Sequence, residues 1–179
     1  MQALSPHKKT MKQSNTKRKA HTLFLLYAAV IGALYATLTF VFGAFSFGMI
    51  QFRVSEVLTI LPFFTPAAIP GLTVGCLVAN LITGNIFDII FGTLATLVAA
   101  LLSYLFRKNS FLVTIPPVVI NALVIPFILK FTYPDCANEA LWLMMLTVGA
   151  GQALACCVVG YPLLLTLKKR GTRLFTIKS

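Results

Sequence analysis

Charged residues are scarce in this sequence: they make up 11% of its 179 residues, whereas soluble proteins carry about 25%. Hydrophobic residues account for 58%. Long uncharged runs occupy nearly the whole chain after Ala20, which leaves no room for a second, soluble domain. Since about 20 apolar residues cross the hydrocarbon core of a bilayer, these features predict an all-α integral membrane protein.

Motifs for catalysis and metal binding are missing as well. The chain has no G-x-x-x-x-G-K-[ST] phosphate loop, no H-E-x-x-H pair and no nucleophile elbow, so we do not expect an ATPase, a zinc peptidase or a serine hydrolase. Its four cysteines show no C-x-x-C spacing, and cysteines in apolar runs behave as small hydrophobic residues. The sequence therefore predicts no enzyme activity, no metal and no cofactor.

Basic residues are the exception, since a formal net charge of +11 comes from 15 Lys and Arg against 4 Asp and Glu. Thirteen of the 15 lie in three clusters, at residues 8–19, 107–108 and 168–178. The positive-inside rule explains all three if they lie on the cytoplasmic side of the cell membrane. The net positive charge is therefore no evidence for nucleic-acid binding, which we do not expect.

Four membrane-spanning helices are expected at residues 22–44, 86–106, 111–131 and 140–167. The stretch between the first two contains Pro62, Pro66 and Pro70, which cannot all sit inside one regular helix. Five spans would put the two basic ends on opposite sides, whereas six put all three clusters inside.

We therefore expect a short helix at 53–62 and another at 66–83, joined by a tight turn on the cytoplasmic side, where the basic clusters lie. The result is a six-helix bundle over residues 21–168 with cytoplasmic basic tails at 1–20 and 169–179. The 53–62 helix would reach only about 15 Å, half the hydrocarbon thickness. Short, proline-interrupted segments at membrane depth are typical of binding sites.

Polar residues near the predicted outer face are the candidate ligand contacts. Arg53 and Glu56 are three residues apart and can pair on one helix face, either as ligand contacts or as a structural ion pair. Asp88 and Asn80 flank a predicted turn, and Asp88 either binds ligand or caps a helix. Trp142 is either an interfacial residue or a stacking platform. Asp135, Asn138 and Glu139 are more typical of a helix start.

Small residues on the first helix form two overlapping registers, Ala28/Gly32/Ala36 and Ala29/Ala33. Such flat stripes let another helix approach closely. On the motif alone, packing within the bundle is the favoured interpretation.

Residues 47–106 carry a resemblance to a known family. The segments IQFRVSE, LPFFTPAAIPG, GCLVAN and DIIFGTLATL resemble the QueT family, the substrate-binding S components of energy-coupling-factor (ECF) transporters for queuosine precursors. The resemblance implies a six-helix S component with a ligand site near the outer leaflet, a transmembrane coupling subunit and two cytoplasmic ATPases. It also implies that Ala29 and Ala33 form the surface that docks on the coupling subunit.

Queuosine precursors such as preQ1 and preQ0 are 7-deazaguanines, whose guanine-like edge offers two adjacent donors to one carboxylate. Glu56 or Asp88 would supply this carboxylate. The remaining polar edges of the ligand would be bound by Gln51, Asn80 and Asn121. The candidates for stacking on the ring are Phe45, Phe47 and Trp142. Alternatives are an S component for another vitamin, such as riboflavin or thiamine, and a non-transporting membrane scaffold.

Overall fold

The computed structural model describes residues 6–43, 53–132 and 138–170, with side chains from residue 16 onward. These ranges contain helices and no strand, as the sequence predicts. In chain order they are α1 (Pro6–Val41), the 3₁₀ helix η1 (Val54–Phe63), α3 (Ala68–Thr83), the π-helical turn η2 (Asp88–Gly92), α4 (Thr93–Leu105), η3 (Leu112–Thr114), α5 (Ile115–Thr132), α6 (Leu141–Ala153), the π-helical η5 (Leu154–Gly160) and α7 (Tyr161–Arg170).

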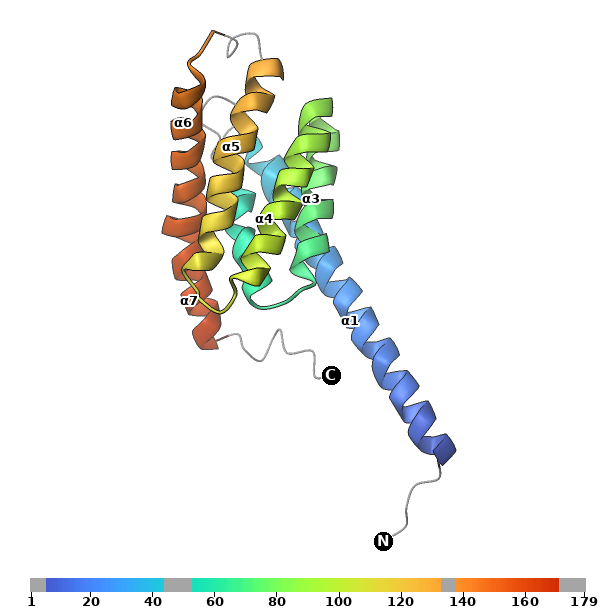
Figure 1. Cartoon of the computed structure of the whole chain (residues 1–179). Helices are drawn as coiled ribbons and strands as arrows, with labels where there is room; N and C mark the ends of the chain where they lie inside the picture. Colours follow the sequence, from blue (N-terminus) through green and yellow to red (C-terminus); the bar gives the residue numbers. More distant parts are fainter. Residues whose placement is uncertain (1–5, 44–52, 133–137, 171–179) are drawn as a thin grey trace.

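The helices form an up-and-down bundle (Figure 1). The chain reverses direction between α1 and η1, η1 and α3, α3 and α4, α4 and α5, and α5 and α6, while α6, η5 and α7 form one continuous rod. The start of α1, the α4–α5 turn and the end of α7 lie at the same end of the bundle (Figure 1), which we call the basic end because it carries the described members of all three basic clusters. The opposite end is called the distal end.

Within the described residues, four helical rods are long and apolar enough to cross a membrane: Thr16–Val41, Asp88–Leu105, Leu112–Thr132 and Leu141–Arg170. The chain is therefore a multi-pass membrane protein. The other two segments, Val54–Phe63 and Ala68–Thr83, are apolar but shorter. They are the pair that the sequence predicts between the first and second long spans.

Prolines explain where the two shorter segments begin and end. Pro66 lies in the turn between η1 and α3, and Pro70 lies in the first turn of α3, where its missing N–H leaves no helix bond unmade. Pro62 lies inside η1. A 3₁₀ helix of 10 residues is unusually long and rises about 2.0 Å per residue, so η1 reaches about 20 Å rather than the 15 Å expected for an α-helix.

Helix α1 begins at Pro6 instead of residue 22, so much of the expected basic tail is helical. Proline is favoured at a first helical position, and the Lys, Gln, Arg and Ala residues that follow are compatible with a helix. The last rod also differs from a regular helix, because residues Leu154–Gly160 are π-helical. Pro162 lies two residues after the end of this π-helical segment and cannot donate a backbone hydrogen bond.

Glycines bring α1 and α3 into close contact. A Cβ at Gly71 would lie 2.7 Å from the carbonyl oxygen of Ala28, and one at Gly75 would lie 2.6 Å from that of Gly32. Any side chain at these two positions would force the helices apart. The Ala28/Gly32 register of α1 is thus used inside the bundle, whereas Ala29 and Ala33 are exposed.

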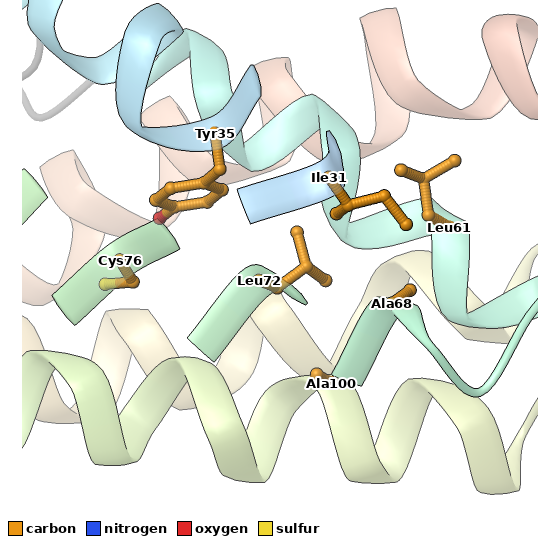
Figure 2. Packing of buried hydrophobic residues seen from close by; sticks show 7 residues of the cluster. All are labelled: Ile31, Tyr35, Leu61, Ala68, Leu72, Cys76 and Ala100. Atoms are coloured by element: carbon orange, nitrogen blue, oxygen red, sulfur yellow. The ribbon is translucent and has the colours of Figure 1, made fainter. Parts of the chain in front are cut away.

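The main apolar core lies beside this crossing. Figure 2 shows Ile31 and Tyr35 of α1 close to Leu72 and Cys76 of α3. Other members of the cluster come from η1, α3 and α4: Leu61, Ala68 and Ala100. Tyr35 is fully buried, so its hydroxyl needs a hydrogen-bond partner inside the protein.

Replacing Gly75 by alanine should destabilise the protein, because overpacking of a tight contact costs about 1–3 kcal/mol. Gly149→Ala is the matched control: its Cβ would meet that of Ala122 at an ordinary 3.4 Å, and alanine favours a helix over glycine by about 1 kcal/mol. The unfolding temperatures of both variants are measured in detergent, with the reactivity of the buried thiols of Cys76 and Cys156 as the readout of unfolding. Equal unfolding temperatures for the two variants would contradict the close crossing.

Candidate functional site

Buried polar side chains from five parts of the chain meet inside the bundle. We call this group the polar core: Tyr35 and Thr39 of α1, Arg53, Ser55 and Glu56 at the start of η1, Asn80 of α3, Asp88 of η2 and Asn121 of α5, each at most 3% exposed. Charged groups at membrane depth are costly and are usually found facing a bundle interior or a cavity. The polar core is therefore the candidate site.

Glu56 connects three helices through its carboxylate. The hydroxyl of Tyr35 donates to Oε1 at 2.5 Å, and Nδ2 of Asn121 donates to Oε2 at 3.4 Å. Beside them, Thr39 Oγ1 donates to Ser55 Oγ at 2.7 Å. These bonds fix η1 against α1 and α5 at the level of the polar core.

Arg53 pairs with Asp88, at 3.7 Å between Nη2 and Oδ1. This differs from the predicted pairing of Arg53 with Glu56. The reason is local: Arg53 is the residue that precedes η1, and the oxygens of Glu56 are directed to Tyr35 and Asn121. The ion pair therefore links η1 to the continuous helical rod of residues 86–105, which contains η2 and α4 and is called the α4 rod. It does not join two residues of the same helix.

Asp88 is held by Asn85 from the α3–α4 turn and by Asn80 of α3. Its Oδ2 accepts a hydrogen bond from Asn85 Nδ2 at 2.9 Å, and its backbone oxygen accepts one from Asn80 Nδ2 at 2.7 Å. Asp88 opens the π-helical turn η2, a feature that is frequent at functional sites. The predicted proximity of Asn80 and Asp88 is present in the structure.

Three buried oxygens in this region have no hydrogen-bond partner among the described residues: Asn80 Oδ1, Asp88 Oδ1 and Thr93 Oγ1. Gly92 lies against two of their side chains, since a Cβ there would be 3.2 Å from Asn80 Nδ2 and 3.4 Å from Asp88 Oδ1. Leaving a buried acceptor without a donor costs about 1–3 kcal/mol. The arrangement is suited to a ligand that brings N–H donors.

A pocket of about 200 Å³ lies between α1 and α3 near the distal end. One of its lining residues, Thr39, belongs to the polar core and donates to Ser55. Another, Thr83, donates to the backbone oxygen of Asn80 at 2.7 Å. The pocket thus reaches the edge of the polar core from the surface.

Among the described residues, one predicted site residue, Trp142, lies apart from the polar core. Trp142 is 65% exposed on α6, and Gln51, with Phe45, Phe47 and Asp135, lies outside the described residues. Two members of the polar core, Tyr35 and Ser55, were not predicted from the sequence. The sequence does hold one indication of Tyr35: it lies four residues before Thr39 in an apolar run, so the two polar side chains share one face of the helix.

The described residues contain no group of three His, Cys, Asp or Glu side chains that would suit a metal ion. The side chain of Cys156 packs against η1, with its Sγ 3.6 Å from the backbone oxygen of Glu56. Gln152, one helical turn earlier, is also buried.

Comparisons with known proteins agree on one family. A family model described as QueT transporter matches residues 25–169. The chain is 41% identical over 83 residues to "Queuosine precursor transporter QueT" of Lactococcus lactis subsp. cremoris (strain MG1363). That match covers 45% of this chain and 49% of the relative, so the chain spans about half the length of the relative it matches. No solved structure matches.

Tyr35→Phe should destabilise the ligand-free protein by about 1–3 kcal/mol, because it removes a donor from a buried carboxylate. Tyr104→Phe is the control, since the Tyr104 ring lies beside Arg107 at the basic end, away from the polar core. Denaturant-induced unfolding of both variants in detergent compares them. Equal stabilities would show that the Tyr35–Glu56 bond does not hold η1 in place.

Proposed function

This chain belongs to the QueT transporter family, and from that premise we propose that it is the substrate-binding S component of an ECF-type importer for a queuosine precursor. The ligand is a 7-deazaguanine such as preQ1 or preQ0. The observation that carries the proposal is the polar core, in which two buried acceptors, Asn80 Oδ1 and Asp88 Oδ1, accept no hydrogen bond from any described residue.

Asp88 and Asn80 are the proposed contacts for the guanine-like edge. Their Oδ1 atoms have no hydrogen-bond partner among the described residues, and adjacent N–H donors on a ligand would make charge-assisted hydrogen bonds with a carboxylate. Arg53 balances the charge of Asp88 from 3.7 Å. This arrangement favours Asp88 over Glu56, whose two oxygens already accept bonds from protein donors.

Glu56 is the proposed second carboxylate. Each carboxylate oxygen has two lone pairs, so Glu56 can keep its bonds to Tyr35 and Asn121 and still accept from the aminomethyl group of preQ1. Asn121 would share this edge, and Gln51 stays a predicted contact. Trp142, exposed on α6, is proposed as an interfacial anchor, since tryptophan is enriched at membrane–water boundaries.

The orientation follows from charge. Because the start of α1 and the end of α7 lie at the same end (Figure 1), the chain crosses the bilayer an even number of times, and we count η1 and α3 as the two short crossings among six. The positive-inside rule assigns the basic end to the cytoplasm, so both termini are cytoplasmic and the polar core opens towards the distal, outer side.

Transport requires partners, proposed to be a transmembrane coupling subunit and two cytoplasmic ATPases. The exposed residues Ala29 and Ala33 are the proposed docking surface for the coupling subunit, because small residues allow close helix contact. The other small register, with Gly32, is already used against α3, which leaves the Ala29/Ala33 register for a partner.

Asp88→Asn should weaken preQ1 binding by roughly 10- to 160-fold, the factor expected when a hydrogen bond to a charged group worth about 1.5–3 kcal/mol is lost. Glu139→Gln is the matched control, because it removes the same charge from the start of α6 at the distal end. Isothermal titration calorimetry of both purified variants gives the affinities. Undiminished binding by Asp88→Asn would remove Asp88 from the site.

Ala33→Leu should prevent assembly with the coupling subunit while leaving preQ1 affinity unchanged, because the added side chain keeps the two helices apart. Ala150→Leu, at an exposed alanine of α6, controls for added bulk. Co-purification with a tagged coupling subunit, alongside titration of the isolated protein, separates the two effects. Normal assembly of Ala33→Leu would place the docking surface elsewhere.

A further inference from the structure

An apolar groove of about 600 Å³ runs between the α4 rod and α5. The segments that line it, residues 87–91 and 123–131, lie in the distal half of the bundle (Figure 1). Aromatic rings form most of its walls: Phe87 and Phe91 from the α4 rod and Phe127 and Phe131 from α5, with Leu123 along the same wall. The rings of Phe87 and Phe131 stack with centroids 6.4 Å apart. These side chains are between 40% and 74% exposed, so the groove opens on the outside of the bundle.

Polar residues lie next to the lining residues at the distal end of the groove, although the lining itself is apolar. Asn85 Nδ2 donates to Thr132 Oγ1 at 3.2 Å, which ties together the ends of the two helices that form the walls. Lys130 is exposed on α5, three residues after Phe127 and seven after Leu123, so it shares a helix face with these two groove residues. Its charge is isolated from the three basic clusters, which lie at the basic end.

The groove is apolar, and Lys130 and the bonded pair Asn85 and Thr132 lie beside its distal end. This arrangement matches an amphiphile with an anionic head group. We propose that the groove binds a membrane phospholipid, with an acyl chain along the phenylalanines and its phosphate beside Lys130. A groove without polar lining cannot satisfy the N–H donors of a deazaguanine, so this site is separate from the polar core. The bilayer supplies the ligand, since both helices span the membrane.

Charge selects the head group. A lysine near an anionic membrane surface contributes about 1 kcal/mol, which corresponds to about a fivefold preference for an anionic phospholipid over a zwitterionic one. The groove also backs directly onto η2, because Phe87 and Phe91 flank Asp88 along the chain. A bound acyl chain would therefore support the turn that holds Asp88 in the polar core.

Fluorescence quenching by brominated lipids tests the proposal. Trp142 is the chain's one tryptophan, so a Trp142→Phe background allows Phe127→Trp, or Leu123→Trp if the first variant does not fold, to report on the groove. The protein is reconstituted in phosphatidylcholine vesicles containing a small fraction of either brominated phosphatidylglycerol or brominated phosphatidylcholine. Val78→Trp, exposed on α3 at a similar distance from the distal end, is the matched control.

Brominated phosphatidylglycerol should quench the groove tryptophan with about fivefold higher relative affinity than brominated phosphatidylcholine. Lys130→Gln should abolish that preference, and the Val78→Trp control should show none. Equal quenching by the two lipids in the groove, or a preference that survives Lys130→Gln, would overturn the assignment. Quenching at Val78→Trp but none in the groove would show that a protein surface covers it, which also overturns the proposal.

Discussion

The carboxylate of Glu56 is the group on which the packing of the distal half depends. It is 1% exposed and accepts bonds from Tyr35 on α1 and Asn121 on α5, so one side chain of η1 connects helices that are far apart in the sequence. A buried charge without partners costs several kcal/mol. The position of η1 in the bundle is therefore set by the need to keep Glu56 between these two donors, and Arg53 and Asp88 follow from that position.

Helix α1 serves two requirements on different faces. One face carries Gly32, Tyr35 and Thr39, which contact α3 closely and reach the polar core. Another carries Ala29 and Ala33 and is exposed. Because a helix is stiff, a movement of Tyr35 or Thr39 at the proposed ligand site would be transmitted to the surface proposed to dock on the coupling subunit.

Much of the fold could be predicted from the sequence, because long uncharged runs and prolines determine membrane helices directly. The four long spans, the two short segments and their turn at the basic end agree with the structure. The start of α1 at Pro6, the 3₁₀ form of η1 and the π-helical turns could not be predicted, since hydrophobic runs do not report backbone hydrogen-bond register. The site was predicted less completely. Asn80 and Asp88 come together as expected, but the pairing of Arg53 with Asp88 and the bond from Tyr35 to Glu56 depend on tertiary packing.

The most direct test of the central claim, that the polar core binds a deazaguanine, is calorimetric titration of the purified protein with preQ1, preQ0, queuine, guanine and riboflavin. We expect a deazaguanine to bind with a dissociation constant of about 1 μM or tighter, which corresponds to about −8 kcal/mol, and riboflavin not to bind. Binding of riboflavin, or of none of these compounds, would contradict the account.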